Sequence, residues 1–293
     1  MAFESMSLCL SHSPGLARDR EEKFGTAFRD GMRRVRDAVA AWEPTLVVFF
    51  GSDHRRAYGQ VLPSISVICS AEGLGDSGSP TGDYDVPEEK AAGLAARLIE
   101  QDFDVALTRR IALDHGFGQN AAQVFGSLDA VPLIPIFINC ASPPLGRPAR
   151  SVALGAAVGR ILSETDERVL FIGSGGMSHN PPTLALTDRG LSEEERREVS
   201  ARHREAAKDD IRPEWDEWFL AALGSAATGW AEALTTDAIA AAGVGAQEMR
   251  TWLAAYAAAG KPMTKVAYEP VREWITGMGI AVSRTELAEG RRA

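Results

Sequence analysis

The chain is most constrained by residues 46–54, an apolar run that ends in a polar tip. Its first five residues are Leu, Val, Val, Phe and Phe, which predict a buried strand. Gly51 is expected to allow a sharp exit from this strand, and a Ser-Asp-His tip follows. In open α/β sheets, ligands bind beyond the carboxyl ends of the strands. His54 is therefore predicted to lie where such a fold does its chemistry.

Three more histidines follow apolar runs in the same way, in a chain that has only five. His12 ends a short N-terminal run, and His115 follows the strand-like residues 105–113. His179 comes after another predicted strand, residues 168–172, and a glycine-rich turn. One histidine in such a place is more often a hydrogen-bonded structural residue than a ligand. Four at equivalent ends of a sheet indicate one convergent site.

The last part of the chain has a different pattern. Residues 191–210 are densely charged and predict a solvated helix, so His203 within them is not a site candidate. The chain that follows is rich in alanine and helical by composition. We expect an α/β fold with a central sheet and flanking helices, and one domain over residues 1–293. Its α/β core, residues 1–182, is expected to carry a mainly helical section, residues 183–293, packed on it.

Two stretches of the predicted core are irregular. Residues 72–85, rich in Gly, Ser, Asp and Pro, predict a long loop that is either a functional lid or a plain surface connection. Residues 131–139 predict a strand whose two prolines require an edge or irregular position. Helical spacing and composition predict helices over residues 21–42, 87–101, 120–128 and 151–163.

Composition limits the classes of function. An apolar fraction of 45% and a charged fraction of 24% are typical of soluble globular proteins, and the net charge of -9 argues against nucleic-acid or anionic-membrane partners. No apolar run reaches transmembrane length, and the N-terminus lacks a signal-peptide pattern. Cys9, Cys69 and Cys140 are widely spaced and odd in number, which favours buried thiols in a reducing cytoplasm.

Imidazole-rich strand ends indicate a metal site. Two histidines and one carboxylate are typical of non-haem Fe(II) oxygenases, but zinc hydrolases use similar sets. Spacing does not separate them, because His12 and His54 come from different strands. Among 40 acidic residues, Glu248 stands out modestly, since it follows the glycine-rich residues 242–246 and opens the apolar helix 249–259. An ordinary acidic residue in a first helical turn is an equally good interpretation.

Taken together, these motifs resemble the class III extradiol ring-cleavage dioxygenases, the family that includes protocatechuate 4,5-dioxygenase. The matching segments keep the same order over nearly the whole chain: residues 9–14, 46–54, 113–117, 131–139, 171–179, 248–252 and 273–275. The combination is specific, whereas no single segment is. Within the family, they look most like members that act on 3-(2,3-dihydroxyphenyl)propionate.

The resemblance implies that His12, His54 and Glu248 ligate Fe(II), with His115 as proton donor and His179 as proton acceptor. It implies ring cleavage by O2 of a substituted catechol in aromatic compound catabolism. The implied substrate is 3-(2,3-dihydroxyphenyl)propionate or a related 3-substituted catechol. A cytoplasmic homo-oligomer is expected.

Two residues beside the implied acid/base pair are supporting candidates. Asp114 either orients His115 or caps the turn that follows it. Pro181, two residues beyond His179, is expected to shape its turn. The charged connection over residues 183–215 is shorter than in the dihydroxyphenylpropionate enzymes, which bears on the ring substituent more than on the chemistry.

Two other classes of function stay open. One is a zinc-dependent hydrolase with the same ligand types. The other is a non-enzymatic, partner-binding protein on the same fold. Relatives that lost the metal are expected to lack part of the triad, and in this chain every position is filled.

Overall fold

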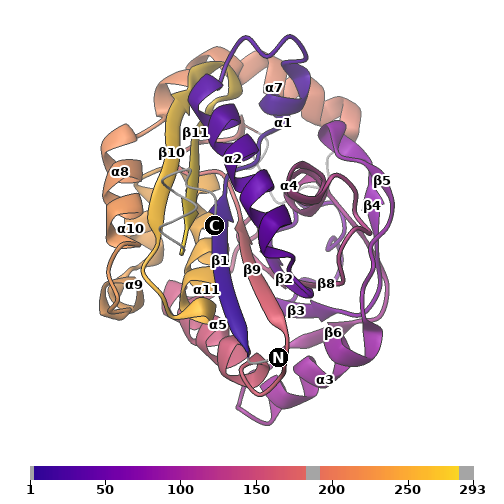
Figure 1. Cartoon of the computed structure of the whole chain (residues 1–293). Helices are drawn as coiled ribbons and strands as arrows, with labels where there is room; N and C mark the ends of the chain where they lie inside the picture. The colour runs from indigo at the N-terminus through magenta and orange to yellow at the C-terminus, as the bar shows by residue number, and fades with distance from the viewer. Residues whose placement is uncertain (1–2, 183–191, 284–293) are drawn as a thin grey trace.

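A mixed sheet forms the centre of the fold (Figure 1). The computed structural model describes residues 3–182 and 192–283. The strands of this sheet are β1 (Glu4–Leu10), β2 (Leu46–Gly51), β3 (Ile65–Ile68), β6 (Ala106–Thr108), β8 (Leu133–Ile138), β9 (Arg168–Ser174), β10 (Thr264–Val271) and β11 (Thr276–Val282). Their order is β10-β11-β1-β9-β2-β8-β3-β6. A smaller sheet, β5-β4-β7, contains β4 (Ala71–Leu74), β5 (Thr81–Asp83) and β7 (Ile111–Leu113).

Helices cover both faces of the large sheet, so the predicted α/β class is confirmed. They are α1 (Pro14–Arg18), α2 (Thr26–Trp42), α3 (Glu88–Ile99), α4 (His115–Phe125), α5 (Pro148–Leu162), α7 (Glu193–Ala207), α8 (Pro213–Ala222), α9 (Gly229–Ala233), α10 (Thr236–Ala240) and α11 (Met249–Ala259). Short 3-10 turns are η1 (Asp76–Gly78), η2 (Lys208–Asp210), η3 (Val244–Glu248) and η4 (Arg272–Trp274). Helices α2 and α4 pack on one face, and α3, α5 and α11 pack on the other (Figure 1).

Strand β2 lies inside the sheet, parallel to β9 on one side and to β8 on the other. Val48 and Phe50 belong to the core under α5 and α11, whereas Val47 and Phe49 belong to the core under α2 and α4. A strand covered on both faces is apolar at every position, which explains the continuous run. Gly51 is not in a left-handed conformation. A Cβ at this position would lie 2.6 Å from the Phe117 ring. The glycine is therefore needed for the close packing of α4, and not for the sharp exit that the sequence predicted.

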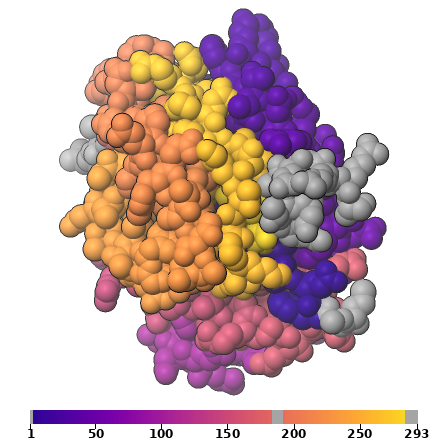
Figure 2. All heavy atoms as spheres, turned by 60° about the vertical axis from the view of Figure 1, so that its left-hand side comes forward, coloured from indigo at the N-terminus to yellow at the C-terminus, as the bar shows by residue number. Residues whose placement is uncertain are grey.

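The C-terminal section contains two strands that its composition did not predict. β11 pairs antiparallel with β1, and β10 continues the sheet outward. Glycine and alanine fill much of β11, and a Cβ at Gly279 would collide with the sulfur of Met177, so small residues are needed there for packing. Figure 2 shows helices α8–α10 (orange) lying against the strand region of β10 (yellow) on one side of the molecule. The division of a single domain at residue 182 stays a prediction, and residues 183–191 of the shortened connection lie outside the described residues.

One expectation about the core was wrong, and another is met in one of its two forms. The predicted loop over residues 72–85 contains most of β4, the turn η1 and strand β5. Strand β8 is an interior strand, although it contains Pro135. The antiparallel pairing of β3 with β8 covers Ile136, Phe137 and Ile138 and stops one residue short of the proline. An irregular place in the ladder, and not an edge strand, accommodates the missing N–H.

Replacing Gly155 with alanine is expected to destabilise the contact between α5 and α11 by about 1–3 kcal/mol, the usual cost of overpacking a core. A Cβ at this position would collide with the backbone carbonyl oxygen of Ala254. Gly93→Ala is the matched control, because it lies in helix α3 with nothing within 4 Å of the added atom. This control is expected to stabilise the fold by about 0.5–1 kcal/mol. Denaturant unfolding measures both, and equal effects would contradict the packing argument.

Candidate active site

The carboxyl ends of three neighbouring parallel strands bring histidines together. His12 follows β1, His54 follows β2 and His179 follows β9. His115 arrives differently, because it follows β7 of the small sheet and is the first residue of α4, earlier than the predicted helix start. All four line one cavity of about 960 Å³. His203 is exposed on α7 and does not line this cavity, as its densely charged surroundings in the sequence predicted.

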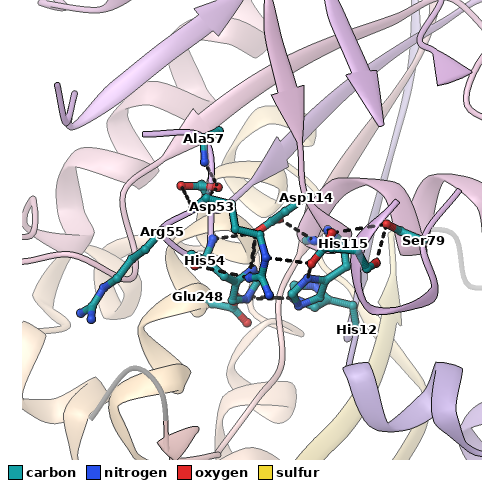
Figure 3. A network of polar contacts seen from close by, with 12 residues as sticks. His12, Asp53, His54, Arg55, Ala57, Ser79, Asp114, His115 and Glu248 are labelled. Atoms are coloured by element: carbon teal, nitrogen blue, oxygen red, sulfur yellow. Dashed lines mark hydrogen bonds and ion pairs between the residues drawn. The ribbon is translucent and has the colours of Figure 1, made fainter. Parts of the chain in front are cut away.

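Glu248 points into the same cluster from the end of η3, directly before α11. Its Oε1 lies 2.9 Å from His54 Nε2 and 3.6 Å from His12 Nε2, and the two Nε2 atoms are 3.4 Å apart. Figure 3 shows these three side chains converging. Oε1 is buried and has no partner with hydrogen-bond geometry in the described part of the chain, whereas Oε2 accepts a bond from the Gly176 N–H at 2.7 Å. A buried, unsatisfied carboxylate oxygen between two imidazoles is a ready ligand for a cation.

The orientation of His12 is fixed by Ser174 at the end of β9. The Ser174 hydroxyl donates to the carbonyl oxygen of Gly116 at 2.6 Å. It can therefore only accept from His12 Nδ1, which lies 3.0 Å away, and from the side-chain amide of Asn120 at 2.9 Å. His12 thus carries its proton on Nδ1 and directs the lone pair of Nε2 toward Glu248.

The orientation of His54 is fixed by Asp114. Asp114 Oδ2 accepts from the His54 backbone N–H at 2.7 Å and lies 3.0 Å from Nδ1. The other oxygen, Oδ1, caps helix α4 by accepting from the Gly116 N–H. Of the two roles considered for Asp114, capping is therefore present, and the histidine that it holds is His54, not His115. A carboxylate behind a histidine is a common support for a metal ligand.

The charges of this cluster suit a bound cation. Burial lowers the pKa of His12 to about 3, so its imidazole is neutral at physiological pH. Burial acts to raise the pKa of Glu248, but His12 and His54 outweigh it and lower the pKa to about 2. Burial also acts to lower the pKa of His54, but the carboxylates of Asp114 and Glu248 raise it well above its usual value. The site therefore stabilises positive charge beside His54 Nε2.

His115 is held by Asp76, which lies in the stretch predicted as a loop. Asp76 Oδ1 accepts from the His115 backbone N–H at 2.7 Å, and Oδ2 lies 2.6 Å from Nδ1. Burial acts to raise the pKa of Asp76, but the hydrogen bond and charge of His115 lower it below its usual value. The rings of His115 and His54 stack with centroids 4.3 Å apart. The carboxylate behind Nδ1 therefore fixes the orientation of the His115 ring.

His179 has a neutral partner instead. Its Nδ1 donates to the backbone carbonyl oxygen of Met177 at 2.8 Å, which leaves the lone pair on Nε2. Burial lowers the pKa of His179, so the ring is neutral at physiological pH. A Cβ at Gly245 would collide with this ring, which explains the glycine-rich loop before Glu248. Pro181 lines the cavity beside it.

The turn that carries His179 is fixed from helix α8, by a residue that the sequence did not single out. Asp216 is fully buried and accepts from the Ser178 N–H at 2.8 Å and from the Ser178 hydroxyl at 2.6 Å. It also accepts from the Tyr268 hydroxyl at 2.8 Å. Nothing in the local sequence distinguishes Asp216 from the many acids around it.

Several ligand atoms are close enough to share one ion. Nitrogen atoms of His12, His54 and His115 all lie within 4.8 Å of one another, and all three residues are buried or half-buried. This cluster can hold a metal ion.

Residues 6–279 match the family described as the catalytic LigB subunit of aromatic ring-opening dioxygenase. The chain belongs to this family, as its motifs indicated.

Known relatives cover almost the whole length of this family member. The 2,3-dihydroxyphenylpropionate/2,3-dihydroxicinnamic acid 1,2-dioxygenase of Rhodococcus sp is 36% identical, with 95% of this chain and 98% of the relative covered. Proteins of the same name from Cupriavidus pinatubonensis (92% and 95% covered) and Paraburkholderia xenovorans (94% and 96% covered) are 37% and 38% identical. The chain is a dioxygenase of this LigB type.

A solved structure supports the fold alone. An uncharacterized protein from Escherichia coli K12 matches with a TM-score of 0.54 and 14% identity, over 95% of this chain and 99% of that one. Among the described residues, no helix combines the length and apolar character needed to cross a bilayer.

Proposed function

We propose that this protein is an Fe(II)-dependent extradiol dioxygenase that cleaves 2,3-dihydroxyphenylpropionate or a related 3-substituted catechol with O2. The observation that carries this proposal is the convergence of His12 Nε2, His54 Nε2 and Glu248 Oε1 within 2.9–3.6 Å of one another. Two histidines and one carboxylate that leave open positions are the ligand set of non-haem Fe(II) oxygenases.

The residues present fit such an ion. Among the described residues, Oε1 of Glu248 has no partner with good hydrogen-bond geometry, and the Nε2 atoms of two oriented imidazoles already point to the same place. Both His12 and His54 have a second hydrogen bond that fixes the ring, as metal-binding histidines usually do. When bound, Fe(II) supplies Lewis acidity toward the catechol oxygens and a route for electrons to O2.

His179 is proposed as the base that accepts a proton in the reaction, and His115 as the acid that donates one. His179 is neutral, with its Nε2 lone pair in the cavity, and so accepts a proton from a catechol hydroxyl. His115 is held at Nδ1 by the Asp76 carboxylate, which balances a positive imidazolium, and so donates a proton from Nε2 to the oxygen that departs. The carbonyl behind one ring and the carboxylate behind the other support these different roles.

The substrate assignment rests on the names of relatives that share 36–38% identity over nearly the full length. The cavity of about 960 Å³ has room for a substituted single ring. We also propose that the chain is cytoplasmic, folds as one domain and assembles as a homo-oligomer. Size-exclusion chromatography with light scattering tests the assembly.

Ring cleavage after metal replacement tests the proposed function. Protein purified without air is loaded with either Fe(II) or Zn(II) and given 2,3-dihydroxyphenylpropionate and O2. A yellow ring-fission product and matching O2 consumption are expected with Fe(II) alone. Ester or amide hydrolysis by the zinc form would instead support the hydrolase. If neither form turned over substrate and another protein bound at the cavity, the partner-binding alternative would be supported.

Asp114→Asn is expected to lower Fe(II) affinity by about 10-fold to 100-fold, the usual effect of removing the support behind a metal-binding histidine. The amide can still cap α4 through its oxygen, but no carboxylate remains behind His54 Nδ1. Competition with a chelator measures the affinity. Asp129→Asn, at an exposed position outside the cavity, is the control and is expected to bind Fe(II) as the native protein does. Equal affinity in the two variants would show that Asp114 does not support the site.

A further inference from the structure

The cavity that holds the four histidines is unusually basic for this chain. Its lining includes two carboxylate residues, Asp76 and Glu193, and six arginines: Arg18, Arg20, Arg56, Arg196, Arg197 and Arg204. The whole chain has 31 basic and 40 acidic residues and a net charge of -9. A cluster of positive charge in the cavity of an acidic protein attracts an anion to that cavity.

Two of these arginines hold the wall of the cavity together. Arg56 lies 3.1 Å from both Asp76 and Glu193, and Arg196 donates to the backbone carbonyl oxygens of His54 and Arg55. Through these contacts helix α7 is fastened to the segment that follows β2. The arginines on the inner face of α7 are therefore fixed relative to His54.

The other four make no ion pair within residues 3–182 and 192–283: Arg18, Arg20, Arg197 and Arg204. On α7, Arg197, Ser200 and Arg204 recur at helical spacing and line the cavity together. Arg18 is the last residue of α1 and lines the same cavity, and Figure 1 shows α1 and α7 at the same end of the molecule. Arg18 and Arg204 line this cavity together and also share a neighbouring hollow, and burial and the charge of Arg204 lower the pKa of Arg18 to about 10. Two neighbouring guanidinium groups without a carboxylate partner are suited to bind one.

We propose that Arg18 and Arg204 bind a carboxylate on the side chain of the catechol substrate, and so select ring substituents that end in a negative charge. This inference rests on the proposed function, since it assigns the part of the cavity that lies beyond the reacting ring. The histidine cluster takes the two hydroxyl groups, and these two arginines take the other end of the substrate. Guanidinium groups recognise carboxylates through paired N–H donors, which an uncharged group does not match.

The test compares two substrates that differ only in charge, 3-(2,3-dihydroxyphenyl)propionate and its primary amide. The native Fe(II) enzyme is expected to prefer the acid, with the difference mainly in KM. In Arg204→Gln and in Arg18→Gln, the ratio of kcat/KM for acid over amide is expected to fall by about 10-fold to 100-fold, the effect of a lost charge-assisted hydrogen bond. Arg204→Lys keeps the charge and is expected to retain part of the preference.

Arg202→Gln is the matched control, because Arg202 is exposed on the same helix and does not line the cavity. It removes the same charge from α7 and is expected to keep the native ratio. An unchanged ratio in both Arg18→Gln and Arg204→Gln, or an equal fall in Arg202→Gln, would overturn this assignment while ring cleavage itself remained. Failure of the native enzyme to cleave either compound would overturn the proposed function and the inference with it.

Discussion

Replacing His12, His54 or Glu248 with alanine is expected to abolish Fe(II) binding and ring cleavage together. Each replacement removes one of the three proposed ligand atoms, which lie within 2.9–3.6 Å of one another, and no other carboxylate among the described residues pairs with both His12 and His54. Two remaining ligands are a weak set for a divalent ion. Iron content per chain and turnover of the substituted catechol, measured on the same preparation, check this expectation.

His203→Ala is the control for these variants. It also removes an imidazole, but from the exposed surface of α7, so both iron and turnover are expected to stay at native levels. His115 is the competing third ligand, because its ring nitrogen lies within 4.8 Å of those of His12 and His54. If Glu248→Ala kept stoichiometric iron and His115→Ala lost it, the ligand set would be three histidines and the proposed triad would be wrong.

The parts of the site that the sequence predicted depend on local patterns. A continuous apolar run followed by a polar tip marks a buried strand and its carboxyl end, and this pattern placed His12, His54 and His179 at one edge of the sheet. The glycine-rich segment before Glu248 was also visible. Its reason was not, because Gly245 is required by the ring of His179, 66 residues away in the chain.

The parts that were missed depend on contacts between distant segments. Asp76 holds His115 from a predicted loop, and Asp216 holds the turn of His179 from a helix with many similar acids. In strand β11, Gly277 makes room for Asp216 and Gly279 for Met177, yet glycine alone suggests a break. In each case the sequence shows an ordinary residue, and only the partner across the fold gives it a role.

His115→Ala and His179→Ala are expected to keep the metal and lose catalysis by roughly 10²–10⁴ in rate each, the usual contribution of a positioned proton donor or acceptor. Neither residue belongs to the proposed triad, so iron content is expected to match the native protein. His115 and His179 both line the cavity, where a bound catechol would meet them. Single-turnover ring cleavage at verified iron content measures the loss.

The pH dependence of the two losses is expected to differ, because the two histidines have different partners. Burial lowers the pKa of His179, and Nδ1 donates to a carbonyl oxygen, so this ring is neutral and is the proposed base. Without it, rising pH ionises the catechol directly, and His179→Ala recovers part of its activity. His115 faces the Asp76 carboxylate and is the proposed acid, and rising pH supplies no substitute for a missing acid. The ratio of His179→Ala to His115→Ala activity should therefore climb with pH at constant iron content. A flat ratio, or one that falls, would mean that the acid and base roles are exchanged or wrongly assigned.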